Sequence, residues 1–307
     1  MAKVSIIVNC YNGEKYLRQA LQSIREQTFQ DYEVIFIDNC STDQSASIAK
    51  SFGTKLKYYK TDKTIPLGAG RNYALDRCAG EYVAFLDCDD LWEPDKLTLQ
   101  TRLLDANPTC CVTMSNISML NMMDGKKSIV LKDTEEKKVS FEDFAIDYEY
   151  GMSSFMLRNS AVKAMDFRFD NRLSYAEEYD FFLRLACFGE VIYLPGVLAV
   201  YRVHTSMNSK KLKDTIPGEY NIVLHNLKTC REGICEEYPK VFLYLEFLRD
   251  YTQTKIFLEQ KENKKARAAI KPYITRYKKA LAFYGLSFLP QRLSHRLFTS
   301  YYSHRVV

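Results

Sequence analysis

Three carboxylates stand together in the segment AFLDCDD (84–90), directly after an apolar run. Like charges this close repel one another and are costly to bury, so something must compensate for them. One interpretation is that one acid caps a helix beginning near Pro94 while the others face solvent. The other is a divalent cation, because carboxylates on alternate residues can converge on Mg²⁺ and leave room for substrate phosphates. On that interpretation Asp87 and Asp89 are the metal ligands, and Asp90 stays open between a substrate contact and a helix cap.

Polar residues also follow two earlier apolar segments. Asp38 and Asn39 come after EVIFI, where a carboxylate or an amide can hydrogen-bond a nucleobase or a ribose. Taken alone, Asp38 is better explained as the cap of the next helix. Asn9 and Tyr11 come after VSIIV, and the tyrosine ring offers a face for stacking a base, with a place in the core as the alternative.

Two further groups of charged residues open helices. The segment LGAGR (67–71) places two glycines and Arg71 at a helix start, where backbone amides and a guanidinium suit an anionic phosphate. Glu177 and Glu178 open a later helix, a position where acids commonly serve the helix dipole. The functional alternative makes one of them a general base whose pKa is tuned by the neighbouring acid and by partial burial.

Three residues downstream have mainly structural interpretations. Asp180 and Arg184 are spaced four residues apart on one helix and are predicted to form a structural ion pair. His204 ends the last predicted strand, and a lone histidine there usually serves packing or lies on the surface. Together with Arg202 near phosphates it would take on a functional role.

The elements that must position these residues alternate between strand and helix. Strands are predicted at 4–8, 33–38, 55–60 and 81–87, with helices at 14–27, at 43–51 and after Gly68. Such alternation favours βαβ units in an α/β fold with a mainly parallel sheet, in which ligands bind beyond the carboxyl ends of strands. Asn9, Asp38 and Asp87 all fall at such ends. Later strands are predicted at 110–116, 153–158 and 191–204, a polar hairpin or loop at 121–138, and a helix at 176–188.

The last hundred residues differ from the rest. From Lys210 onward the pattern is helical, so residues 1–208 are predicted to form one domain and 209–307 a helical extension. No acidic residue follows Glu262, whereas ten lysines and arginines do. Residues 264–307 mix these cations with aromatic rings, as an interfacial membrane segment does. The alternative is a helical subdomain that packs on the body or on a dimer partner.

Composition sets the expected compartment. Nine cysteines without a CxxC pair favour reduced thiols and argue against a zinc site. The first residues, MAKVSIIVNCYNG, predict a strand and a turn rather than a signal peptide, and no apolar run is long enough to span a bilayer. We therefore expect a cytoplasmic protein, with the basic segment as a contact to the cytoplasmic membrane face. The acidic balance of the body argues against a continuous nucleic-acid footprint.

The order of these motifs resembles a known family. The segments VSIIVNCYNGEKYLRQALQSIREQTFQDYEVIFIDNCSTDQS, GAGRNYALDRCAGEYVAFLDCDDLWEPDKL and AEEYDFFLRLACFGEVIYLPGVLAVYRVHTSMNS are similar to those of the family 2 glycosyltransferases with the GT-A fold. The resemblance covers roughly residues 3–208 and leaves out the helical extension. It implies a Rossmann-like sheet flanked by helices and transfer of a sugar from a nucleotide-diphosphate donor, a UDP-sugar, to a glycan or lipid-linked acceptor in surface polysaccharide synthesis.

The resemblance also assigns roles to single residues. It places the nucleotide at Asn9, Tyr11, Asp38 and Asn39, the donor phosphates near Arg71, Asp87 and His204, the Mg²⁺ or Mn²⁺ ion on Asp89 and Asp87, and the catalytic base at Glu178.

Two positions depart from the family's usual pattern. Asp38-Asn39-Cys40 stands where Asp-Asp-Gly is commonest, which puts the nucleotide preference in doubt, and Glu178 replaces the usual aspartate with a side chain one methylene longer.

Two other functional classes would share parts of this pattern. A sugar nucleotidyltransferase would share the sheet and the acids, but Tyr11-Asn12-Gly13 is a poor loop for activating a triphosphate. A non-catalytic membrane-associated scaffold would keep the fold without needing the acids and Arg71, all of which are present. We therefore predict an inverting, metal-dependent glycosyltransferase in which Glu178 deprotonates the acceptor hydroxyl.

Overall fold

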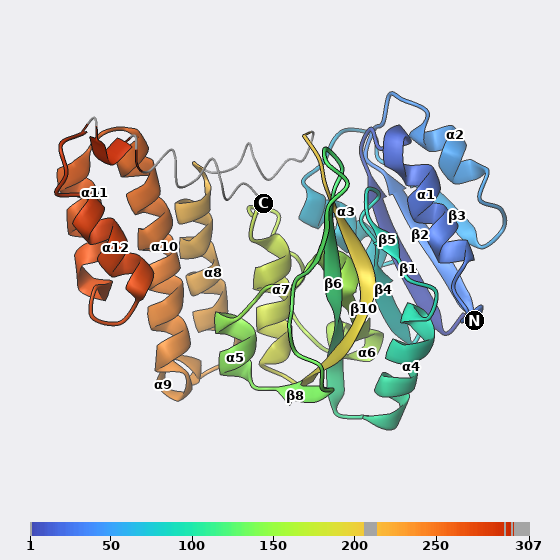
Figure 1. Ribbon diagram of the computed structural model, residues 1–307. Helices are drawn as coiled ribbons and strands as arrows, with labels where there is room; N and C mark the ends of the chain where they lie inside the picture. The colour runs from blue at the N-terminus through green and yellow to red at the C-terminus, as the bar shows by residue number, and fades with distance from the viewer. Residues whose placement is uncertain (1, 206–213, 292, 296, 298–307) are drawn as a thin grey trace. The chain divides into compact units, whose positions relative to one another are not determined.

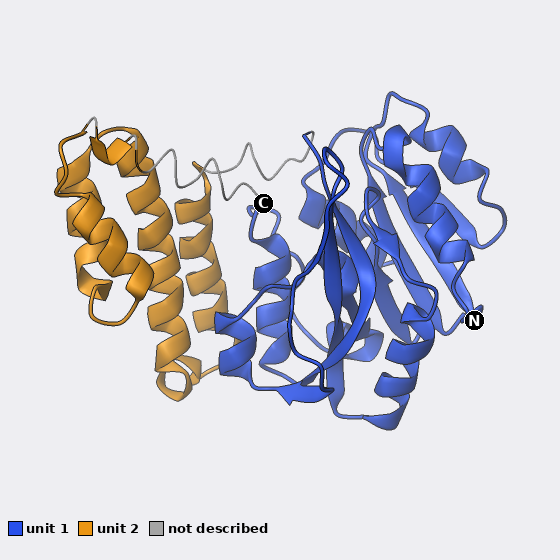
Figure 2. Ribbon diagram, in the orientation of Figure 1, with its two compact units in different colours: residues 1–207 blue, residues 208–307 orange. Residues whose placement is uncertain are grey.

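The computed structural model describes residues 2–205, 214–291, 293–295 and 297 (Figure 1). The chain divides into two compact units, residues 1–207 and 208–307 (Figure 2). The end of the predicted membrane segment, residues 298–307, and the predicted junction around 206–213 lie outside the described residues.

The first unit contains a ten-stranded sheet whose path runs β3-β2-β1-β4-β9-β6-β10-β5. Four neighbouring strands are parallel and come from the part of the chain where strands and helices were predicted to alternate. They are β1 (Val4–Cys10), β2 (Tyr32–Asp38), β3 (Leu56–Lys60) and β4 (Tyr82–Phe85). A second parallel pair joins β6 (Cys110–Asn121) to β10 (Glu190–Val203). The α/β class expected from the alternation is therefore confirmed.

Antiparallel pairing links these two parallel groups. β9 (Phe155–Arg158) lies between β4 and β6 and is antiparallel to both. Consequently β6 and β10 run in the same direction as β4, and the amino end of β9 lies at the edge where these parallel strands end. The remaining antiparallel strands are β5 (Leu91–Trp92) and β8 (Lys137–Val139) on β10, and β7 (Lys127–Ile129) on β6.

β10 covers a stretch in which the sequence contains a proline and a glycine. The sequence predicted a strand over 191–204, and the structure places one strand of 14 residues there, Glu190–Val203. Its register against β6 shifts between Leu194 and Val197, so an irregularity absorbs Pro195 and Gly196 without ending the strand.

Helices cover both faces of the sheet (Figure 1). They are α1 (Glu14–Arg25), α2 (Ser45–Lys50), α3 (Leu67–Leu75), α4 (Lys96–Ala106), α5 (Phe141–Ile146), α6 (Asn159–Lys163) and α7 (Glu177–Ala186). Apolar side chains of α1, α2 and α4 share one core with alternate residues of β1 and β2. On the other face the Phe182 ring of α7 stacks on Phe155 of β9 at 3.9 Å between centroids, and α3 packs on β1 and β2.

The second unit is helical. Its elements are α8 (Ile216–Cys230), α9 (Ile234–Glu237), α10 (Pro239–Glu259), α11 (Asn263–Ile270), the 3₁₀ turn η3 (Lys271–Tyr273) and α12 (Lys278–Leu286). Its core holds stacked aromatic rings, among them Phe247 and Tyr277 with centroids 4.1 Å apart. None of the described helices combines the length and the apolar character that crossing a bilayer requires.

A close approach between β1 and the start of β4 requires a glycine at position 80. A Cβ on Gly80 would lie 2.6 Å from the backbone nitrogen of Ser5, and the Gly80 nitrogen donates to Ser5 Oγ at 2.9 Å. We therefore expect Gly80→Ala to lower the free energy of unfolding by about 1–3 kcal/mol in chemical denaturation, because the two backbones must move apart.

Gly151→Ala is the matched control for that substitution. A Cβ on Gly151 meets its nearest atom, Ile117 Cδ1, at an ordinary 3.6 Å, so its unfolding midpoint should stay close to the wild-type value. Equal stability of the Gly80 variant and the wild type would show that this backbone contact does not constrain the sheet.

Candidate active site

Asn9 and Tyr11 lie at the carboxyl end of β1. Asn9 Nδ2 donates to the carbonyl of Leu67 at the start of α3, at 3.4 Å, and its Oδ1 is buried with no hydrogen-bond partner among the described residues. A Cβ on Gly70 would lie 3.0 Å from Asn9 Nδ2, so the glycine lets α3 approach this amide. The Tyr11 side chain is 53% exposed, which rules out the core alternative and leaves its ring open to a ligand.

Asp38 and Asn39 at the end of β2 contact the protein's own backbone and side chains. Asp38 is fully buried; it accepts from the Ser41 backbone nitrogen at 2.8 Å and from the Tyr58 hydroxyl at 2.5 Å. Asn39 donates to the carbonyl of Ile65 and accepts from its nitrogen, each at 2.8 Å. Asp38 therefore holds the loop after β2 and does not cap the next helix, because α2 begins at Ser45 with Gln44 as its N-cap. Asn39 fixes the segment that leads into α3.

The amides at the start of α1 are also engaged. The backbone nitrogens of Asn12, Gly13 and Glu14 donate to side-chain oxygens at 3.0, 2.9 and 2.9 Å. Their acceptors are Ser41, Ser45 and Asp43, which all precede or begin α2. The amides of the loop after β1 are therefore engaged by residues around the start of α2. A loop whose amides are engaged in this way is poorly suited to binding a triphosphate.

Arg71 is buried between two carboxylates from distant parts of the chain. Its guanidinium is 3% exposed and donates to Glu177 Oε1 at 2.7 Å and to Asp87 Oδ1 at 3.1 Å. Burial alone would lower the pKa of Arg71, but Asp87, Glu177 and Glu178 together raise it, so the group carries a full positive charge. Arg71 thereby joins the end of β4 to the start of α7.

The two acids that contact Arg71 both have raised pKa values. Burial raises the pKa of Glu177, whose Oε2 has no hydrogen-bond partner among the described residues. Burial also raises the pKa of Asp87, and the neighbouring Asp89 adds to that rise although Arg71 opposes it. One guanidinium therefore compensates only part of the negative charge at this edge.

Asp89 faces the end of β10. Its Oδ2 lies 3.0 Å from Nε2 of His204, and the His204 ring packs against Tyr16 with centroids 4.8 Å apart. The backbone carbonyl of Asp89 accepts from Nε of the buried Arg202. The antiparallel pairing of β5 with β10 brings Asp89 close to Arg202 and His204, because β5 directly follows the acids and pairs with the end of β10.

Asp90 is buried and is neither exposed to a substrate nor the cap of a helix. It accepts from the Ser153 hydroxyl at 2.7 Å and from the Arg202 backbone nitrogen at 3.0 Å. Burial, followed by the charges of Asp89 and Asp87, raises its pKa well above the usual range. α4 begins only at Lys96, so the cap predicted near Pro94 does not involve Asp90.

Glu178 lies in the first turn of α7, among the charges just described. Burial is the main cause that raises its pKa to about 8; Arg71 opposes the rise, and Glu177 and Asp87 add to it. The backbone amide of Met152 is close enough to its carboxylate to oppose that rise. A carboxylate with a pKa near neutrality is suited to general base catalysis.

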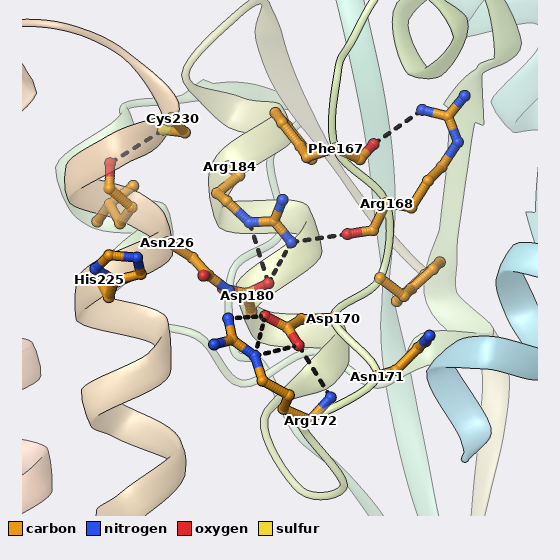
Figure 3. A network of polar contacts seen from close by, with 12 residues as sticks. Phe167, Arg168, Asp170, Asn171, Arg172, Asp180, Arg184, His225, Asn226 and Cys230 are labelled. Carbon is orange, nitrogen blue, oxygen red and sulfur yellow. Dashed lines mark hydrogen bonds and ion pairs between the residues drawn. The ribbon is translucent and has the colours of Figure 1, made fainter. Parts of the chain in front are cut away.

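The next acid of α7 has a structural role, as the sequence predicted. Arg184 Nε donates to Asp180 Oδ2 at 3.0 Å, and Arg184 Nη2 donates to the carbonyl of Arg168 at 2.9 Å (Figure 3). The pair ties α7 to the loop that precedes it and thereby fixes the helix whose first turn carries Glu178.

The side chains of this edge supply only some of the oxygen ligands that a hard divalent cation needs. Among the described residues, no group of three or more His, Cys, Asp or Glu side chains is arranged as a metal site. The Asp87 and Asp89 side chains are 32% and 37% exposed, and each has one oxygen engaged by Arg71 or His204. Mg²⁺ commonly takes one or two carboxylates and completes its shell with water and substrate phosphates, so these two carboxylates fit a site that the donor completes.

The sequence did not indicate Ser153 or Tyr58. Ser153 contacts Asp90 and the Asp87 backbone, and Tyr58 contacts Asp38. Ser153 lies in a short turn without apolar periodicity, and Tyr58 lies within a strand whose alternation suggested only packing.

Comparison with known families identifies the first unit. The model of Glycosyl transferase family 2 matches residues 5–163, a little over half of the 307 residues. An uncharacterized glycosyltransferase of Rickettsia typhi is 28% identical over 225 residues, which are 67% of this chain and 65% of the relative. The chain thus spans slightly less than two thirds of the length of that relative.

Solved structures share the fold. TarS of S. aureus, residues 1–349 in complex with UDP-GlcNAc, aligns with a TM-score of 0.72 and 21% identity over 98% of this chain and 92% of its own. The mannosyltransferase PcManGT of Pyrobaculum calidifontis, in complex with GDP-Man and Mn²⁺, aligns with a TM-score of 0.61 and 16% identity over 97% and 83%. Both are GT-A glycosyltransferase folds, in agreement with the fold predicted from the sequence.

The raised pKa of Glu178 predicts a pH-dependent stability. Between about pH 4.5 and pH 8 the folded chain keeps a proton that the unfolded chain releases, so this carboxyl destabilises the fold increasingly as pH rises through that window. Glu178→Gln imitates the protonated form. We expect its melting temperature, relative to the wild type, to be higher at pH 8.5 than at pH 5.

Glu136→Gln serves as the control, because Glu136 is exposed. Its difference from the wild type should not vary between the two pH values. A pH-independent difference for Glu178→Gln would mean that the carboxyl titrates normally.

Proposed function

The chain belongs to glycosyltransferase family 2, and from that premise we propose that it is an inverting enzyme transferring a sugar from a nucleotide-diphosphate donor to a hydroxyl group. Glu178 carries the proposal: its pKa is raised to about 8, and it lies within the electrostatic reach of Arg71, Glu177 and Asp87. These residues come from three separate parts of the chain: the middle of α3, the segment after β4 and the first turn of α7.

In the proposed reaction, ionised Glu178 accepts the proton of the acceptor hydroxyl. The hydroxyl oxygen forms a bond to the anomeric carbon from the face opposite the diphosphate, and the bond from that carbon to the diphosphate oxygen breaks. The diphosphate leaves with the bonding electrons, so a single displacement inverts the anomeric configuration. Buried Arg71 keeps a fixed positive charge beside Asp87, where the leaving group gains negative charge.

We propose that Asp89 and Asp87 bind Mg²⁺ or Mn²⁺ together with the donor diphosphate. The cation, when bound, neutralises charge on the departing diphosphate. Support comes from the partial exposure of both carboxylates and from the donor set, which leaves coordination positions for phosphate oxygens. His204, 3.0 Å from Asp89, holds that carboxylate in place and lies where it can approach the same phosphates.

For the donor we propose a UDP-sugar, with Tyr11 stacking on the base and Asn9 contacting the nucleotide. Tyr11 is exposed at the end of β1, and the Asn9 carboxamide oxygen has no partner among the described residues. Asp38 and Asn39 shape the base site through Ser41 and Ile65, which they hold. TarS, which has the same fold, was solved with UDP-GlcNAc, and PcManGT with GDP-Man, so a guanine nucleotide is the alternative to test.

For the acceptor we propose a glycan or lipid-linked carrier of surface polysaccharide synthesis at the cytoplasmic membrane face. What supports this is the charge of the second unit, in which no acid follows Glu262 and lysines and arginines recur. On and after α12, Leu281 and Phe288 are 57% and 56% exposed; Leu281 follows the exposed Lys278 and Lys279, and the Arg267 guanidinium lies 3.6 Å from the centroid of the Phe288 ring. Apolar and cationic side chains together are typical of surfaces that bind anionic bilayers.

The reaction is tested with a panel of UDP-sugars and GDP-sugars in the presence of Mn²⁺, measuring sugar transfer and donor hydrolysis. We expect Glu178→Gln to lose at least about 100-fold in turnover while donor binding persists, because the base is missing. Asp89→Ala should instead lose the effect of Mn²⁺ on donor binding.

Glu136→Gln, an exposed carboxylate, should transfer at the wild-type rate. If Glu178→Gln and Asp89→Ala both keep wild-type transfer, the proposed mechanism is wrong.

The membrane contact is tested by flotation of the protein with vesicles of anionic phospholipid. The double substitution Leu281→Glu and Phe288→Glu should abolish flotation, because it removes apolar contact and introduces repulsion. Ile129→Glu, at a residue of the first unit that is 62% exposed, should leave flotation unchanged. If the wild type does not float and sediments as a dimer, the surface pairs two copies of the chain instead.

A further inference from the structure

A buried turn, η1 (Met152–Ser154), lies beside both reactive parts of the site. Its three residues are 2%, 2% and 0% exposed. The turn leads directly into β9, whose antiparallel direction puts its amino end at the edge where β4 ends. A segment between two distant motifs is thereby brought next to the acids that follow β4.

One side of the turn holds the acidic segment. Ser153 Oγ donates to Asp90 Oδ2 at 2.7 Å and accepts from the backbone nitrogen of Asp87 at 3.1 Å. A single hydroxyl thus binds the chain both before and after Asp89. Arg202 holds the same segment from the other direction, through the Asp89 carbonyl and the Asp90 side chain.

The other side of the turn reaches the proposed base. The backbone amide of Met152, one residue before Ser153, is close enough to the carboxylate of Glu178 to act on its pKa. The distance between the base and the acidic segment is therefore set through two consecutive residues of one turn. A shift of this turn alone would therefore act on both Glu178 and the acidic segment.

The turn itself is rigidly supported. The Ser153 carbonyl accepts from Trp92 Nε1 at 2.8 Å, and the Ser154 carbonyl accepts from Gln100 Nε2 at 2.9 Å. The buried Nζ of Lys96 hydrogen-bonds Gln100 and lies 3.4 Å from the Ser154 carbonyl oxygen. α4 and β5 therefore fix the turn from behind, independently of any ligand.

We propose that Ser153 is a positioning residue for the transfer reaction, holding the Asp87–Asp89 segment at a fixed place relative to Glu178. This rests on the proposed function, in which Asp87 and Asp89 bind the cation and the donor diphosphate. A segment that is ordered before binding loses little conformational entropy when the cation and the diphosphate arrive, and so binds them more tightly. Without the hydroxyl, the Asp87 amide and the Asp90 carboxylate lose a partner together.

The neighbouring serine offers a matched control. Ser154 Oγ donates to the carbonyl of Gly151 at 2.8 Å, within the turn, and is also buried. Ser153→Ala and Ser154→Ala remove the same atom from adjacent buried positions, but only the first removes contacts to the acidic segment. Ser153→Thr keeps the hydroxyl and serves as the conservative variant.

The first measurement is UDP binding by calorimetry with and without Mn²⁺, using the full chain. We expect Ser153→Ala to weaken Mn²⁺-dependent UDP binding about tenfold, Ser154→Ala to leave it unchanged, and Ser153→Thr to restore it at least in part. The pH dependence of turnover should keep its apparent pKa in Ser153→Ala, because the substitution leaves the Met152 amide beside Glu178. Equal weakening by both alanine variants, or none by Ser153→Ala, would overturn the proposal.

The second measurement, amide hydrogen exchange over residues 86–91, requires neither metal nor activity. Exchange should become faster in Ser153→Ala, because the Asp87 amide loses its acceptor, and should be unchanged in Ser154→Ala. Unchanged exchange in Ser153→Ala refutes the positioning role even if the enzyme proves active. Faster exchange in a chain that transfers no sugar supports the positioning role and refutes the proposed function instead.

Discussion

The buried guanidinium of Arg71 is the interaction on which the rest of the site depends. It lies 3% exposed between Glu177 and Asp87, which come from residues far apart in the sequence. Burying such a group is costly, and its attraction to two carboxylates repays that cost only if the geometry is maintained. Loss of any one of the three would leave an uncompensated charge in the interior, so α3, β4 and α7 are held in one relative position.

The position of the Arg71 guanidinium also explains the raised pKa of Glu178. Because Glu177 and Asp87 already accept from the guanidinium, Glu178 gains from Arg71 only through space. Burial and its two acidic neighbours then outweigh that attraction and raise its pKa to about 8. The same arrangement that fixes the geometry therefore leaves one carboxyl able to exchange a proton near neutral pH.

The sequence could predict those parts of the site that follow from local pattern. Apolar runs ending in polar residues placed Asn9, Asp38 and Asp87 at strand ends, and the i,i+4 spacing predicted the pair Asp180 and Arg184. What Asp38 contacts could not be decided, because the Tyr58 hydroxyl reaches it from the next strand. The partner of Arg71 was beyond prediction for the same reason: Glu177 follows it by 106 residues.

The antiparallel strand β9 explains why Ser153 carried no signal. In a purely parallel sheet, only the residues after strands meet at the ligand-binding edge, and a search of strand ends would find them all. Reversal of β9 brings the residues before a strand to that edge, where Ser153 meets Asp87 and Asp90. The three acids of the segment then have separate partners: Asp87 contacts Arg71, Asp89 contacts His204, and Asp90 accepts from Ser153 and the Arg202 backbone. Partners from four elements or loops thus hold these acids, and the turn that precedes the reversed strand supplies the partner of Asp90.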